Sequence, residues 1–130
     1  MADSQGRSDL HHSASGGTAG EAKRLIESGE DPNLQDNEGF APLHFAAQQQ
    51  NVEVARVLLE HGAVVDAVNK FGNTPLFVAV FNSRGDGRMI VLLRSAGADP
   101  FKANAHGHSP VSLARKIANY DVAQFFRDLD

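Results

Sequence analysis

The sequence predicts an all-α fold in which a short pair of helices is repeated along the chain. Three related segments carry this prediction: FAPLHFAA at 40–47, NTPLFVAV at 73–80 and HSPVSLAR at 108–115. Their prolines, Pro42, Pro75 and Pro110, are spaced by 33 and then 35 residues. A second apolar segment follows each phrase, and the first two of these segments end in Gly-Ala. Repeats of this length are typical of proteins whose units stack side by side.

The first helix of each unit is expected to begin at its proline. Thr74 and Ser109 place a hydroxyl at the N-cap, and proline fits the first helical position because an N–H there has no partner within the helix. Ala41 replaces the hydroxyl in the first of the three segments, which should weaken that cap by about 1 kcal/mol. A small residue follows each proline by four positions and permits neighbouring units to approach closely: Ala46, Ala79 and Ala114.

The second helix of each unit carries apolar residues at helical spacing, in VEVARVLLEHGA (52–63), MIVLLRSAGA (89–98) and DVAQFF (121–126). Gly62 and Gly97 suit the left-handed residue that ends a helix. An acidic or amide residue and a glycine precede each proline phrase and predict a tight, projecting hairpin between units. These turn residues are Asp36, Gly39, Asn69, Gly72, Asn104 and Gly107.

A fainter copy lies at the front of the chain. A shift of 33 residues places LHHSA (10–14) on LHFAA and EAKRLIESG (21–29) on VARVLLEHG. The sequence therefore predicts one domain over 9–130, with units at about 9–30, 31–63, 64–98 and 99–130. The first unit is expected to lack its opening loop and the last to end inside its final helix. Residues 1–8 are expected to form a flexible terminus.

The order D/N-x-x-G-x-T/S-P-L-H-x-A-A, followed by V-x-x-L-L-x-x-G-A, resembles the ankyrin repeat over about residues 9–130. The resemblance implies a solenoid whose units share one core, because a single unit cannot bury its own faces. It also implies a concave surface, formed by the hairpin tips and the exposed side of the first helices, that binds another protein.

Three departures from the family pattern have structural consequences. The three proline phrases do not keep both residues of T-P-L-H, since they pair Ala41 with His44, Thr74 with Phe77, and Ser109 with Ser112. The two extra residues of the third unit fall in NSRGDGR (82–88). Arg94 stands where the preceding unit has Leu59, which predicts a shifted helix or a more polar outer face. At the end of the chain, Phe125, Phe126 and Leu129 are expected to point inward.

Composition narrows the classes of partner and chemistry. The formal charge is −4 with acids and bases intermixed, which argues against a nucleic-acid or membrane partner. The absence of cysteine excludes thiol catalysis and thiolate metal sites. No signal-peptide pattern and no apolar run of membrane-spanning length occur, so a cytoplasmic protein, monomeric when unbound, is expected.

No catalytic or metal-binding pattern stands out from the repeat. His11 and His12 are adjacent, and His106 and His108 flank a glycine, but two imidazoles without further ligands are a weak metal signal. The segment GGTAG (16–20) lacks the form of a phosphate-binding loop. No cofactor and no enzymatic activity are expected. The alternative is a small-molecule or metal-binding protein, or an enzyme, with a histidine-lined site near His106 and His108.

The expected function is that of a non-enzymatic module that binds one protein, an enzyme or a toxin, and inhibits or sequesters it. A bacterial immunity protein is the most specific form of this expectation. Phe40, Phe71 and Phe81 occupy positions where the repeat does not require an apolar residue, and aromatic side chains often anchor interfaces. The other reading is that each ring folds against its own hairpin. Mapped from the resemblance, the partner-binding residues are Asn37, Glu38, Phe40, Gln48, Gln49, Lys70, Phe71, Asn73, Phe81, Asn82, His106, His108 and Lys116.

Overall fold

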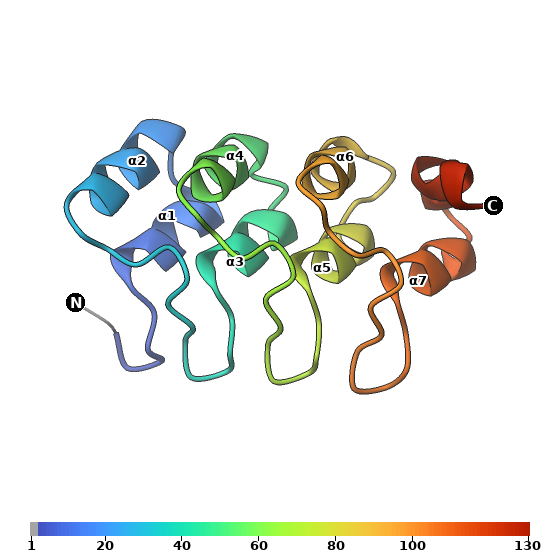
Figure 1. The fold of residues 1–130 in the computed structure, drawn as a ribbon, viewed down its shortest axis with the longest axis horizontal. Coiled ribbons are helices and arrows are strands. Elements are labelled where there is room, and N and C mark those ends of the chain that lie inside the picture. Colours follow the sequence, from blue (N-terminus) through green and yellow to red (C-terminus); the bar gives the residue numbers. More distant parts are fainter. Residues whose placement is uncertain (1–2) are drawn as a thin grey trace.

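A computed structural model describes residues 3–130 as a row of stacked helix pairs (Figure 1). Helices α1, α3, α5 and α7 lie beside the projecting hairpins, and the remaining helices form a second row. The described residues contain no strand, so the prediction of an all-α solenoid is confirmed. The elements are α1 (Asp9–Gly16), α2 (Ala19–Glu27), α3 (Pro42–Gln48), α4 (Val52–Glu60), α5 (Pro75–Phe81), α6 (Arg88–Ser95), α7 (Pro110–Lys116) and the 3₁₀ helix η1 (Val122–Leu129).

The helices α3, α5 and α7, which lie beside the hairpins, begin at their prolines as predicted. The side-chain oxygens of Thr74 and Ser109 accept hydrogen bonds from backbone N–H groups in the first turns of α5 and α7. Ala41 has no such oxygen, and its own backbone N–H donates to His44 Nδ1 at 3.0 Å. Gly62 and Gly97 adopt φ values of 92° and 96° after α4 and α6, which is the left-handed conformation expected of them.

Each hairpin is closed by an acidic or amide side chain. In the third unit, Asn69 Oδ1 accepts from the backbone N–H groups of Phe71 and Asn73 at 3.0 and 3.1 Å. Asp3 Oδ1 accepts in the same way from Gln5 and Arg7, at 2.9 and 3.0 Å. The first unit therefore has an opening hairpin, and the expectation that it lacks one is wrong.

Consecutive hairpins are joined by backbone hydrogen bonds. The N–H of Asn37 donates to Gln5 O at 2.8 Å, and the N–H of Lys70 donates to Glu38 O at 3.0 Å. Residues 3–8, expected to form a flexible terminus, are thus bonded to the second unit. The same expectation for residues 1–2 lies outside the described residues.

Two buried histidines connect consecutive units along the row of helices beside the hairpins. His11 and His44 each accept a backbone N–H of their own unit at Nδ1, both at 3.0 Å. Each donates from Nε2 to a carbonyl oxygen of the following unit, that of Phe40 at 2.8 Å and that of Asn73 at 2.9 Å. Burial lowers the pKa of both imidazoles, so the neutral form is favoured. His11 is therefore a buried residue that joins two units.

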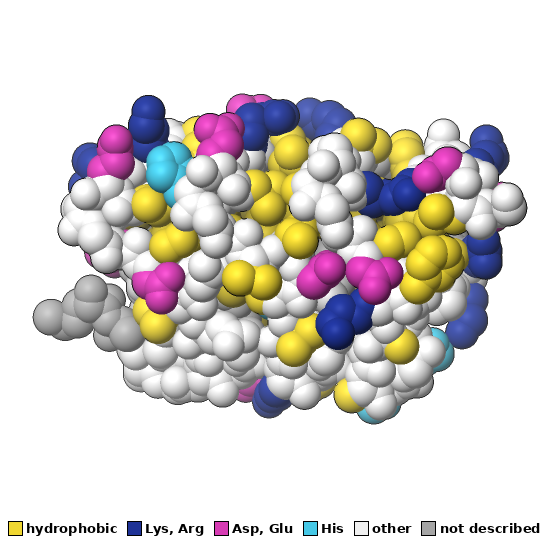
Figure 2. Space-filling view, viewed as in Figure 1, with side chains coloured by type: hydrophobic (Ala, Val, Ile, Leu, Met, Phe, Trp, Pro, Cys, Tyr) yellow, Lys and Arg dark blue, Asp and Glu magenta, His cyan; other side chains and the backbone are white. Residues whose placement is uncertain are grey.

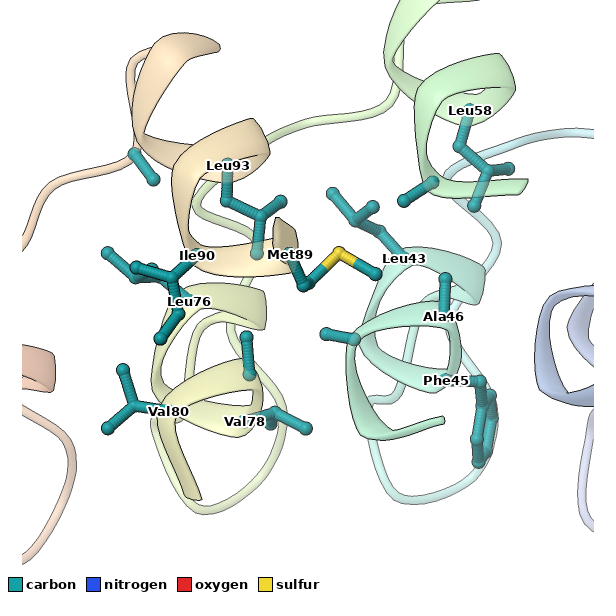
Figure 3. Packing of buried hydrophobic residues seen from close by; sticks show 14 of the residues in the cluster. Leu43, Phe45, Ala46, Leu58, Leu76, Val78, Val80, Met89, Ile90 and Leu93 are labelled. Carbon is teal, nitrogen blue, oxygen red and sulfur yellow. The ribbon is translucent and has the colours of Figure 1, made fainter. Parts of the chain in front are cut away.

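The core runs between the two rows and from one unit to the next (Figure 3). Leu58, Leu76 and Leu93 are fully buried. Met89 of α6 points toward Leu43 of α3, so the insertion before α6 does not interrupt the packing of neighbouring units. Within residues 3–130 no helix has the length and apolar content needed to cross a membrane.

Arg94 connects α6 to the final 3₁₀ helix. Its guanidinium donates to both carboxylate oxygens of Asp128, at 2.7 and 2.8 Å, and to Phe125 O at 2.9 Å. The ion pair raises the pKa of Arg94 and lowers that of Asp128. Phe126 is buried while Phe125 and Leu129 are half-buried, so the inward placement expected for the last turn is confirmed.

The inserted segment at 82–88 packs against this same end of the chain. Gly87 lies so close to Phe125 that a Cβ at this position would be 2.2 Å from the ring. Arg84 adopts a φ of 51° and is exposed, whereas Arg88 is paired with Asp86 at 2.7 Å. The insertion thus supports the terminal helix.

A candidate protein-binding groove on the hairpin face

A hollow of about 260 Å³ lies among α3, α5 and the hairpins of the second and third units. We call it the aromatic groove, and its lining residues are Phe40, Gln48, Asn69, Phe71, Asn73, Phe77, Val78, Phe81 and Asn82. The structure brings together here all three phenylalanines assigned from sequence to the partner-binding surface. It also brings three of the assigned amide residues to the same place.

The aromatic side chains of the groove differ in exposure. Phe81 is 69% exposed and Phe71 is 41% exposed. Phe40 is half-buried, with its ring stacked on Phe45 at a centroid distance of 5.4 Å and edge-on to His44 at 5.5 Å. Phe40 therefore packs against residues of α3, whereas the alternative reading had each ring folding against its own hairpin. Phe71 and Phe81 present apolar surface to solvent, which is where an interface gains most from burial.

The helical geometry of α5 explains why Phe77 joins this set. Residues four apart lie on the same side of a helix, so Phe77 and Phe81 both face the groove. Leu76 and Val80, each one position earlier, lie on a different side of the helix and are fully buried. Phe77 was not predicted from the sequence because the residue was interpreted only as a departure from the T-P-L-H phrase. Its spacing from Phe81 was the available signal.

The groove is electrically neutral. None of its lining side chains is ionisable. At its edge Lys70 pairs with Glu38 at 2.6 Å, and the Lys70 ammonium lies 5.1 Å from the centroid of the Phe71 ring. The arrangement favours an apolar, uncharged occupant, since a charged group would lose hydration without gaining a partner.

The other residues assigned to the surface lie outside the groove. Asn37 donates from its backbone and its side chain to Gln5 and Ser4 of the first hairpin. Gln49 lines an adjoining hollow of about 230 Å³ beside Arg84, which shares Gln48 and Asn82 with the groove. The three fourth-unit residues are exposed, and two of them are neighbours, with Lys116 Nζ 3.4 Å from His108 Nδ1. His106 is the third.

The histidine pair is not part of a larger ligand set. Across the described range no group of three or more histidine, aspartate or glutamate side chains is arranged to hold a metal ion. Within the described residues, the fold therefore adds no third histidine, aspartate or glutamate ligand to a metal site at His106 and His108.

A larger hollow of about 530 Å³ lies on the second row, between α4 and α6. Charged side chains, Glu53, Arg56 and Arg88, project at its rim, and Val91 is 56% exposed beside them. Figure 2 shows charges of both signs intermixed over this row and few on the projecting hairpins. Interface cores are depleted of charge and enriched in aromatic residues, so the aromatic groove is the better candidate.

Comparison with known proteins adds the family context. A family model described as ankyrin repeats, in three copies, matches residues 10–104. Transient receptor potential cation channel subfamily A member 1 from Homo sapiens is 34% identical over 113 residues, which cover 86% of this chain and 10% of that protein. The nuclear factor NF-kappa-B p105 subunit from Gallus gallus is 36% identical over 106 residues, covering 80% of this chain and 11% of the subunit.

A third relative matches nearly the whole chain. Neurogenic locus notch homolog protein 1 from Danio rerio is 35% identical over 122 residues, which are 93% of this chain and 5% of the relative. The chain thus spans only a small part of each of these relatives. What it shares with them is the repeat.

Proposed function

Since this chain belongs to the ankyrin-repeat family, whose repeats mediate protein–protein interaction, we propose that it binds another protein through its hairpin face. The aromatic groove is the centre of the proposed contact. The ankyrin-repeat domain is an interaction module without catalytic activity of its own. The proposed output is occlusion, in which the module covers a functional surface of its partner and thereby inhibits or sequesters it.

One observation carries the proposal: Phe71 and Phe81, 41% and 69% exposed, line the same groove together with the half-buried Phe40. A partner that covers this exposed hydrophobic cluster removes apolar surface from water, which makes binding more favourable. Amide side chains at the groove edge, Gln48, Asn73 and Asn82, provide donors and acceptors for a polar rim.

An enzyme or a toxin is the kind of partner that occlusion would control, and a bacterial immunity protein is the most specific form of the proposal. The relatives bear the names of a channel, a nuclear factor subunit and a neurogenic locus protein. This diversity supports binding as the shared property.

Replacing the two exposed rings tests the proposal. Immobilised wild-type protein should retain one abundant partner from a lysate of its source cells, and the Phe71→Ala/Phe81→Ala variant should lose it. The melting temperature should change little, because these side chains contribute less to the core than buried ones. Phe101→Ala is the matched control: Phe101 is 58% exposed but lies outside the groove, so its removal should leave capture intact.

The occlusion step is then measured on the captured partner. Addition of the wild-type protein should reduce the partner's activity, and addition of the double variant should not. Equal capture by the double variant and the wild type would contradict the proposed surface. A collapse of the melting temperature in the double variant would show that the rings belong to the core.

A further inference from the structure

The aromatic groove contains a buried hydrogen-bond donor without an acceptor. Asn69 lines the groove and is 5% exposed. Its Oδ1 is used twice within the hairpin, whereas its Nδ2 is buried and has no hydrogen-bond partner. A buried polar group left unpaired costs free energy, and such groups are rare in folded proteins.

Comparison of the units explains why this donor is unpaired. In the unit before, Arg7 Nε bonds Asp36 Oδ2 at 3.2 Å. In the unit after, Asn104 Nδ2 donates to Asn73 Oδ1 at 2.8 Å. At each of these junctions the preceding unit supplies the hydrogen-bond partner. The equivalent residue at the Asn69 junction is Phe40, which stands 33 residues after Arg7 and 33 before Asn73. An aromatic ring has no oxygen to accept from the amide, so the side chain that makes the groove aromatic also leaves Asn69 unpaired.

We propose that Asn69 determines which segments the groove binds, by donating from Nδ2 to a backbone carbonyl of the partner. The occupant is an uncharged, extended segment of the partner protein. It places one bulky apolar side chain against Phe71, Phe77 and Phe81, and offers a neighbouring carbonyl to Asn69. This inference rests on the proposed function and specifies the chemistry of that same surface.

The size and charge of the groove favour such a segment. Its volume of about 260 Å³ is below the roughly 300–1,000 Å³ of small-molecule sites, and it suits one or two side chains. A carboxylate or phosphate would meet no free cation there, because the nearby Lys70 is already paired with Glu38. A peptide carbonyl is the neutral acceptor that every partner protein carries. Because Nδ2 is buried in the free protein, the proposed contact requires a neighbouring side chain of the groove to move when the segment binds.

The probes for the test are random linear peptides displayed in a library, selected on the wild-type protein and counter-selected on the Phe71→Ala/Phe81→Ala variant. Selected peptides should carry a bulky apolar residue flanked by uncharged residues. Their affinity should fall by about tenfold or more in Asn69→Asp, because that change replaces the donor with an acceptor. Aspartate keeps the Oδ1 contacts of the hairpin, as Asp36 does natively in the second unit.

Gln48→Glu is the matched control for charge. It adds a carboxylate to an exposed residue of the same groove without touching the buried donor, and it should reduce peptide affinity far less than Asn69→Asp. A second readout uses the unmodified protein. The side-chain NH₂ resonances of Asn69 should shift strongly when the selected peptide is titrated, whereas those of Asn33, which already donates to Gly62 O, should not.

The outcomes separate this inference from the proposed function. If peptides distinguish the wild type from the double phenylalanine variant, but bind Asn69→Asp as well as Gln48→Glu, the role of Asn69 is overturned and the groove remains the binding surface. If Asn69→Asp does not fold, unshifted NH₂ resonances overturn the inference by themselves. If no peptide distinguishes the double variant from the wild type, the proposed surface is wrong as well.

Discussion

The third residue of the first-helix phrase is not the same in every unit: it is His11, His44, Phe77 and Ser112 in turn. His11 and His44 bridge to the next unit through Nε2, and Ser112 bonds within its own cap to Ser109. Phe77 makes no such bridge and instead lines the aromatic groove. The third unit has therefore exchanged a structural hydrogen bond for aromatic surface.

The two buried histidines predict how stability depends on pH. Burial lowers the pKa of His11 and His44, so the folded protein binds fewer protons than the unfolded chain, whose imidazoles titrate near pH 6.5. Their contribution to stability is therefore present above about pH 6.5 and is lost as the pH falls below it. Urea unfolding monitored by circular dichroism at several pH values should show this loss.

A double variant, His11→Gln/His44→Gln, is the control. It should be less stable near neutral pH, because a flexible amide replaces each imidazole that bridges to the carbonyl of Phe40 or Asn73. It should also lose stability less steeply upon acidification. An unchanged pH slope in the double variant would mean that other groups control the acid sensitivity.

At the scale of elements, the repeat phase predicted the helix pairs but not every detail of the ends. The hairpin at Asp3 was missed because residues 1–8 lack the proline phrase by which the other units were aligned, although Asp3 and Gly6 stand 33 residues before Asp36 and Gly39. The 3₁₀ form of η1 was also missed, since an apolar pattern of two turns does not separate it from an α-helix.

The surface could be predicted only in outline. Phe71 and Phe81 stood out because the repeat does not require apolar residues there. The unpaired Nδ2 donor of Asn69 could not be inferred from the sequence, since it depends on which side chain of the preceding unit lies beside it. The fourth-unit residues were assigned by the same mapping, yet the structure places them outside the groove.

Arg94 predicts the behaviour of the terminal helix. Its guanidinium, on α6, donates hydrogen bonds to η1 at the Asp128 carboxylate and the Phe125 carbonyl. In Arg94→Ala, backbone amides of Val122–Leu129 should exchange with deuterium faster, while those of α1 to α4 should remain protected. Mass spectrometry of peptic fragments measures both sets.

The matched control is Arg127→Ala, which removes a pair with Asp121 in which both side chains are well exposed. Exposed pairs contribute little to stability, so this change should have a much smaller effect on the exchange of η1. Equal exchange in the two variants would show that Arg94 does not fasten the helix.

Across the whole molecule, one physical rule separates core from surface. Each unit shares its apolar faces with its neighbours, and the side chains that this sharing leaves outside are free to serve binding. The hairpins are joined to one another from the first unit to the fourth, so the hairpin face forms one continuous support for the groove. A partner can therefore bind with little rearrangement of the backbone.

Hydroxyl-radical footprinting of the partner complex tests whether the aromatic groove is the binding surface, because it reports the solvent access of individual aromatic side chains. Phe71 and Phe81 should become protected in the complex, whereas Phe101, which is 58% exposed outside the groove, should react as it does in the free protein. Unchanged reactivity of Phe71 and Phe81 in a saturated complex would contradict this placement of the binding surface.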